Sequence, residues 1–173
     1  MSIKLLARTA MIAAIYTAIS LFFAPLSFGP FQVRISEALV LLPVIAPGSI
    51  IGLTVGCILT NTVGFFMGAN IIGWADIIFG SAATLIAALC TYAFRNIRFR
   101  GVPVLSAIPP VLCNAVIIGA ELTFVFNGSF QLAFFASQAF SVGIGQIVSC
   151  MLFGLPLVLY IEKQPRLLTF FKE

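Results

Sequence analysis

Long apolar runs dominate the chain, and short polar or proline-rich segments separate them. The runs are continuous, so they favour buried or membrane-spanning helices over strands, whose apolar residues would alternate with polar ones. A membrane span needs about 20 such residues, so the pattern predicts an all-α bundle of six transmembrane helices forming one membrane domain over residues 1–173. The expected helices cover residues 5–24, 33–46, 48–67, 73–94, 104–126 and 132–161.

Two of these segments have distinctive patterns. The second is short because Pro43 and Pro47 interrupt it, and about eleven or twelve helical residues rise only about 16–18 Å. It therefore either continues past a proline kink or crosses a thinned region. The third has a small residue at every fourth position, a pattern typical of closely packed membrane helices. These residues are Gly48, Gly52, Gly56, Thr60, Gly64 and Gly68.

Composition supports the membrane assignment, and charge gives an orientation. Only 8% of the residues are charged and 61% are hydrophobic, whereas soluble domains have about 25% charged residues. Six helices bring the basic residues to one side, and basic loops mark the cytoplasmic face. We therefore expect both termini in the cytoplasm. The basic residues concerned are Lys4, Arg8, Arg95, Arg98, Arg100, Lys163, Arg166 and Lys172.

Several kinds of chemistry are excluded by the residues that are missing. The chain has no histidine and no GxxxxGK[ST] phosphate loop, so it lacks a histidine-based triad or metal site and the usual means of binding ATP. The four cysteines are far apart within apolar runs, and we interpret them as small buried side chains. We expect no enzyme activity, no cofactor and no metal site.

The ionisable residues inside the apolar chain are the candidates for function, because such residues are costly in lipid. Arg34 and Glu37 lie one turn apart, Asp76 falls in the first turn of its helix, and Glu121 is near the end of the fifth helix. A local salt bridge between residues 34 and 37 and helix capping by Asp76 are structural alternatives. The six-helix topology, however, places all four residues toward the outer face, which predicts a shared polar ligand site.

A seam of small residues follows one face of the first helix. Ala10, Ala14 and Ala18 recur every fourth position and allow another backbone to come close. The seam is either packed within the chain or a docking face for a separate subunit.

Three segments resemble a known family: FGPFQVRISEALVLLP, the following GCILTNTVG, and GWADIIFGSAATLIAAL. They are similar to QueT-type queuosine-precursor transporters, which are substrate-binding S components of energy-coupling factor (ECF) transporters. The resemblance implies a multi-pass protein of the cell membrane with a cytoplasmic N-terminus and an outer ligand site. Its partners would be one transmembrane coupling subunit and two ATPase subunits, and Ala10, Ala14 and Ala18 would meet the coupling subunit.

The implied ligand is a 7-deazaguanine precursor of queuosine, and the polar residues fit that chemistry. A guanine-like ring offers N–H donors that a carboxylate accepts and a carbonyl that arginine or an amide can bind. Trp74, Phe28 or Phe31 would stack on the ring. The expected substrate-binding residues are Arg34, Glu37, Asn61, Trp74, Asp76, Asn114, Glu121 and Gln138.

Two other functions are compatible with the sequence. One is a self-sufficient carrier, coupled to protons through Glu121 or Asp76 and dimeric along the glycine ladder of the third helix. The other is an assembly subunit without a ligand, for which replacing Glu37 or Asp76 would leave function intact.

Overall fold

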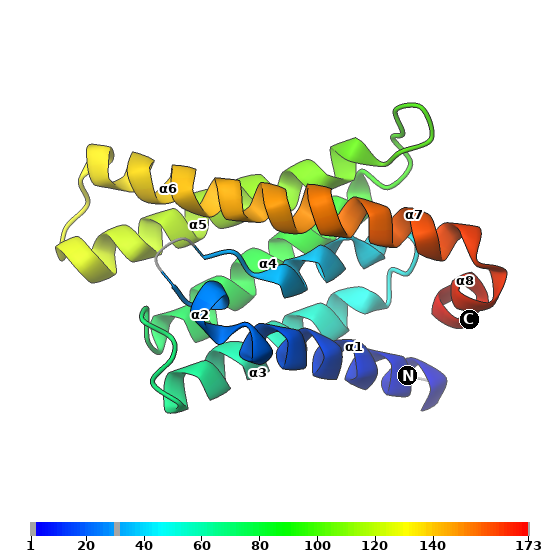
Figure 1. Ribbon diagram of the computed structural model, residues 1–173, viewed down its shortest axis with the longest axis horizontal. Coiled ribbons are helices and arrows are strands. Elements are labelled where there is room, and N and C mark those ends of the chain that lie inside the picture. The colour runs from blue at the N-terminus through cyan, green and yellow to red at the C-terminus, as the bar shows by residue number, and fades with distance from the viewer. Residues whose placement is uncertain (1–2, 30–31, 173) are drawn as a thin grey trace.

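The computed structural model describes residues 3–29 and 32–172, which form helices and one isolated β-bridge between Phe99 and Val102. The helices are α1 (Ile3–Phe22), α2 (Ala24–Ser27), α3 (Ser49–Phe66), α4 (Ala75–Ala93), α5 (Ile108–Asn127), α6 (Leu132–Ile147), α7 (Leu155–Lys163) and α8 (Pro165–Lys172), with 3₁₀ segments η1 (Ile35–Val44) and η2 (Val104–Ala107) and a π-helical segment η3 (Val148–Gly154). Figure 1 shows them as an elongated bundle.

Within the described residues, five helices are long and apolar enough to cross a membrane. Their spans are Ile3–Phe22, Ser49–Phe66, Ala75–Ala93, Val104–Asn127 and Leu132–Lys163. Each overlaps one of the expected helices, and they differ mainly at the ends. The remaining expected helix, over residues 33–46, takes a different form.

This segment, η1, is a 3₁₀ helix of ten residues with Pro43 inside it. At about 2 Å per residue it rises about 20 Å, which is less than the thickness of the hydrocarbon core. It packs against α1, α3, α4, α7 and η3, and most of its side chains are buried. The short second helix was therefore predicted, but its 3₁₀ geometry and its enclosure by the other helices were not.

The glycine ladder of α3 packs against α1. A Cβ atom on Gly52 would lie 2.8 Å from the carbonyl oxygen of Thr9, and one on Gly56 would lie 3.1 Å from Cα of Ala13. Further along the ladder, Gly64 lies against the ring of Phe28, whereas Gly68, the last predicted member, lies beyond the end of α3 and is exposed. The ladder thus brings two backbones together, as the pattern predicts. The glycines within α3 are already covered within the chain, so they do not provide the dimer seam that the self-sufficient carrier would need.

We expect Gly52→Ala to lower the free energy of unfolding by about 1–3 kcal/mol, because the methyl group would push α1 away from α3. The control is Gly143→Ala in α6, where the new Cβ would meet only Ala115 at an ordinary 3.7 Å. That change should be neutral or stabilising by up to about 1 kcal/mol, since alanine favours helix. Thermal unfolding of the purified proteins in detergent measures both. Equal midpoints for the two variants would contradict the close approach.

The final span contains an irregularity that the apolar pattern does not indicate. Between α6 and α7, the π-helical η3 widens the helix and packs against η1. A Cβ atom on Gly154 would lie 3.0 Å from the carbonyl oxygen of Ala38, and the Cys150 thiol donates a hydrogen bond to the Glu37 carbonyl oxygen at 3.7 Å. The irregular turn therefore adjoins the segment that carries Glu37.

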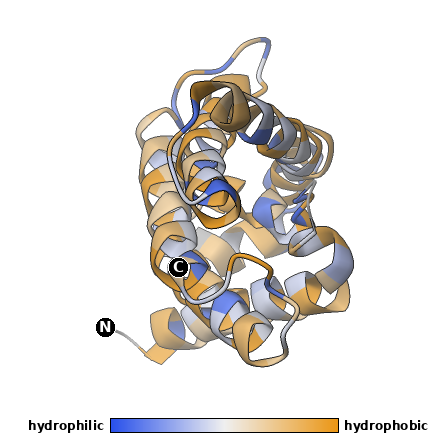
Figure 2. Cartoon of the chain, turned by 90° about the vertical axis from the view of Figure 1, so that its left-hand side faces the viewer, coloured by the Kyte–Doolittle hydropathy of each residue, from blue (hydrophilic) through white to orange (hydrophobic). Residues whose placement is uncertain are grey.

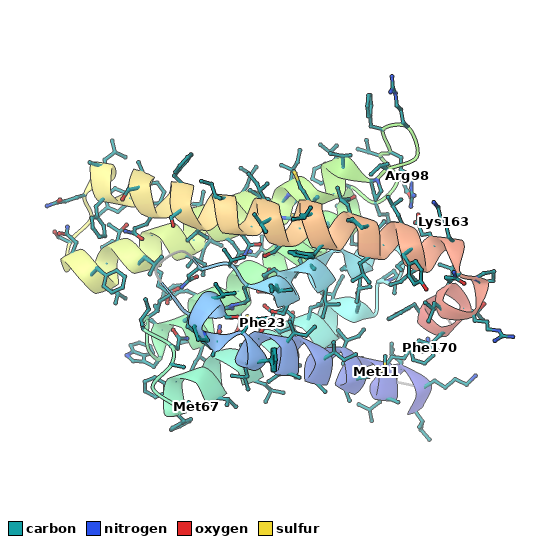
Figure 3. The ribbon with its side chains drawn as sticks, viewed as in Figure 1. Met11, Phe23, Met67, Arg98, Lys163 and Phe170 are labelled. Atoms are coloured by element: carbon teal, nitrogen blue, oxygen red, sulfur yellow. The ribbon has the colours of Figure 1, made fainter. Side chains whose placement is uncertain are left out.

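The two ends of the bundle differ in charge. Both termini and the loop that follows α4 lie at one end, and α2 and the loops after α3 and α5 lie at the other (Figure 1). Figure 3 shows Arg98, Lys163 and Phe170 at the first end and Met67 toward the opposite end. Arg98 donates hydrogen bonds to Glu162, and these bonds raise the pKa of Arg98. The basic residues therefore share one end, as their distribution in the sequence predicts.

The outer surface of the bundle is apolar. Large hydrophobic side chains such as Leu59, Leu89, Leu112 and Leu152 are exposed along the long helices. Figure 2 looks along the bundle and shows ribbons coloured mainly hydrophobic. A surface of this kind is suited to contact with lipid.

Candidate functional site

The interior contains a polar cluster, in which η1 supplies the two ionisable residues that are closest in sequence. Arg34 is the N-cap of η1 and Glu37 falls in its first turn. Both are buried. They do not form the local salt bridge considered above. Arg34 pairs with Asp76 of α4 instead, so the two neighbouring ionisable residues have different partners.

Asp76 is the partner of Arg34. Its Oδ2 atom lies 3.3 Å from Arg34 Nη2 and accepts a hydrogen bond from Asn70 Nδ2 at 2.8 Å. Asn61 of α3 donates to the Asp76 carbonyl oxygen at 2.6 Å. Although Asp76 is in the first turn of α4, no side-chain capping bond is formed there. The ion pair with Arg34, rather than helix capping, therefore explains why the Asp76 carboxylate is buried here.

Glu37 is held by neutral donors. The Tyr16 hydroxyl donates to Oε1, and Thr84 lies 3.4 Å from the same oxygen. Asn114 of α5 lies 3.5 Å from Oε2 and donates more closely, at 3.0 Å, to the Pro110 carbonyl oxygen. Glu37 thus contacts side chains of α1, α4 and α5, and it connects the central segment to three of the long helices.

The cluster has two levels along the bundle axis. Thr84 on α4 and Asn114 on α5 approach Glu37 at the deeper level. Asp76 precedes Thr84 by eight residues and Glu121 follows Asn114 by seven, which places each about 10–12 Å further along its helix. The helices α4 and α5 are consecutive and antiparallel (Figure 1). Asp76 and Glu121 are therefore both displaced from the Glu37 level toward the end of the bundle where α2 lies.

Arg34 is enclosed by an aromatic ring and a thiol. Its guanidinium carbon lies 5.3 Å from the centre of the Phe28 ring, and Nη1 is 3.7 Å from Cys57 Sγ. Phe28 follows α2 and is itself buried against Gly64. Phe28, which was expected to stack on the ligand ring, therefore lies against the arginine, whereas Phe31 lies outside the described residues.

The remaining predicted residues lie in different environments. Glu121 is 6% exposed, and neither carboxylate oxygen has a hydrogen-bond partner among residues 3–29 and 32–172. Trp74 is 64% exposed beside the cluster. Gln138 is half-buried on α6 and makes none of the hydrogen bonds described above. The structure thus brings Arg34, Glu37, Asn61, Asp76 and Asn114 into one network.

Four members of the network were not predicted: Tyr16, Cys57, Asn70 and Thr84. The apolar helix around Tyr16 gives no indication that its hydroxyl faces a carboxylate from a later segment. Asn70 has a weak signal, because it is a polar residue six positions before Asp76. Thr84 lies two turns beyond Asp76 on the same face of α4, and that spacing could have identified it.

Comparison with known proteins gives one match. The family model described as QueT transporter matches residues 6–163, nearly the whole chain. Searches of curated proteins and of solved structures each found no match. The matched region contains every residue of the polar cluster. It also contains the membrane-length helices of the described residues, apart from the first three residues of α1. The chain therefore belongs to the QueT transporter family, and it is an integral membrane protein that transports a small molecule.

Proposed function

We propose that the protein is the substrate-binding S component of an ECF-type importer, and that it captures a 7-deazaguanine precursor of queuosine for ATP-driven uptake. The observation that carries the proposal is the buried cluster around Arg34, Asp76 and Glu37, which lies toward the end opposite the basic residues. Ionisable groups inside a membrane bundle are expensive, and they usually mark a substrate pathway or binding site.

The donors and acceptors of the cluster suit a purine-like ring. Carboxylates accept N–H groups from the edge of the ring, while arginine and asparagine donate to its carbonyl oxygen. Asp76, Glu37, Arg34 and Asn61 offer both kinds of group within one buried network. The basic end would face the cytoplasm of the cell, so the ligand would enter from the outside near α2.

The partner module would dock on α1. Ala10, Ala14 and Ala18 are exposed, whereas the neighbouring Ala13 is covered by α3. This leaves the predicted seam accessible from the membrane. A transmembrane coupling subunit would contact it, and the two ATPase subunits would supply the energy. Substitution of Ala14 by leucine should weaken co-purification with the coupling subunit and leave ligand binding intact.

Calorimetric titration of the purified protein with 7-cyano- and 7-aminomethyl-7-deazaguanine tests the ligand. We expect selective binding of at least one compound, no response to riboflavin, and loss of binding in Asp76→Asn. In liposomes, uptake should require the partner subunits and ATP. Full-rate uptake by this chain alone, driven by a proton gradient, would overturn the proposed mechanism.

A further inference from the structure

Several acceptor oxygens lack a partner in the part of the polar cluster nearer α2, the level of Asp76 and Glu121. Asp76 Oδ1, both oxygens of Glu121 and Oδ1 of Asn61 are buried and have no hydrogen-bond partner within the described part of the chain. Buried polar atoms are nearly always paired, so each exception needs an explanation. Four unpaired acceptor oxygens at one end of the bundle call for a partner that brings N–H or O–H groups.

The position of Glu121 relates it to this cluster. Glu121 and Asn114 differ by seven residues, so they share one face of α5, and Asn114 faces Glu37. Gly119 packs against Ala139 of α6. Glu121 is two residues further along α5, so its side chain points about 200° around the helix axis from Gly119. Glu121 therefore faces away from α6, toward α4, where it lies close to Ala75 and Phe79.

The charges of the cluster do not balance within the chain. Arg34 forms the cluster's one ion pair, with Asp76, while Glu37 is held by hydroxyl and amide donors. Glu121 has no hydrogen-bond partner within the described part of the chain. Three carboxylates thus share one guanidinium in a buried site, and an unpaired buried charge is strongly unfavourable. A positively charged ligand would correct this imbalance.

We propose that Glu121 and Asp76 form a subsite for a protonated amine, and that Glu121 determines selectivity for a ligand that carries one. This inference rests on the proposed function. A primary ammonium group has three donors and no acceptor, so it complements unpaired carboxylate oxygens. A nitrile in the same position has no donor and would leave those oxygens unpaired. Between the two precursors, the protein should therefore prefer the aminomethyl compound.

The test compares the two 7-deazaguanines on the full-length protein in nanodiscs by isothermal titration calorimetry. Wild type should bind the aminomethyl compound about tenfold more tightly than the cyano compound or better, since hydrogen bonds to charged groups are the strong ones. Glu121→Gln keeps the shape of the side chain but removes its charge. It should lose this preference chiefly by weakening binding of the amine.

Glu162→Gln is the matched control, because it makes the same chemical change at the opposite, basic end of the bundle. It should keep the wild-type preference. Glu121→Asp retains the charge and should keep the preference with weaker binding, which also guards against a Gln variant that does not fold. Thermal unfolding of each variant checks its integrity.

The outcomes separate this inference from the proposed function. If both compounds bind wild type equally, or Glu121→Gln keeps the preference for the amine, the amine subsite is wrong and the proposed function stands. If neither compound binds wild type, the proposed function fails and the subsite with it.

Discussion

Replacing Arg34 with methionine is expected to destabilise the protein by about 3–5 kcal/mol, the usual cost of removing one partner from a buried ion pair. Methionine keeps much of the length of the side chain and removes its charge. Asp76 would lose the guanidinium at 3.3 Å, and Glu37 and Glu121 would lose the cluster's only cation. Chemical or thermal unfolding in detergent measures the loss.

Arg98→Met provides the comparison. Arg98 also pairs with a carboxylate, Glu162, but the two side chains are 33% and 22% exposed. Pairs open to solvent contribute about 0–1 kcal/mol, so this variant should unfold almost like wild type. Adding Asp76→Asn to Arg34→Met should recover part of the lost stability, because it removes the uncompensated charge. A wild-type unfolding midpoint for Arg34→Met alone would contradict a structural role for the buried pair.

Gly80→Ala is expected to weaken ligand binding by about a hundredfold, and also to lower stability because it strains the buried Arg34–Asp76 pair. A Cβ atom at this position would collide with Asp76 Oδ1 and lie 2.8 Å from Asn61 Nδ2. Asp76 cannot move without giving up its bonds to Arg34 and Asn70. Misplacing charged hydrogen-bonding groups costs about 1.5–3 kcal/mol, and each 1.4 kcal/mol is a tenfold change in affinity.

Calorimetry with the tighter-binding 7-deazaguanine measures this loss. Gly143→Ala serves again as the control, because it adds the same methyl group to a helix where there is room. It should leave the affinity unchanged. Equal affinities for the two glycine variants would show that ligand binding does not depend on the position of the Asp76 carboxylate.

The sequence predicts the long helices well because their signal is local. A run of about 20 apolar residues needs no knowledge of its neighbours to be recognised. The glycine spacing of α3 likewise indicates close packing, although it does not identify α1 as the partner. The 3₁₀ segment η1 and the π-helical segment η3 pack against each other, with Gly154 lying against Ala38. Such contacts between distant segments have no local signature.

The site is predictable to a similar extent. Charged residues in apolar runs identify Arg34, Glu37 and Asp76, because the cost of burial makes them exceptional. Their pairing is not predictable in the same way, since Arg34 and Glu37 are close in sequence and yet have different partners, Asp76 for Arg34 and Tyr16 for Glu37. Tyr16 was missed because an aromatic residue is unremarkable in an apolar helix. Its hydroxyl becomes significant only when η1 places Glu37 beside it.

The enclosure of η1 has a consequence for biogenesis. A ten-residue segment that begins beside an arginine and carries a glutamate in its first turn is a poor substrate for independent insertion into a bilayer. The long helices can enter the membrane one at a time, but η1 depends on neighbours that are made after it, including α4 and η3. The chain must therefore be nearly complete before this segment reaches its final position, so the polar cluster around Arg34 and Glu37 forms late in synthesis.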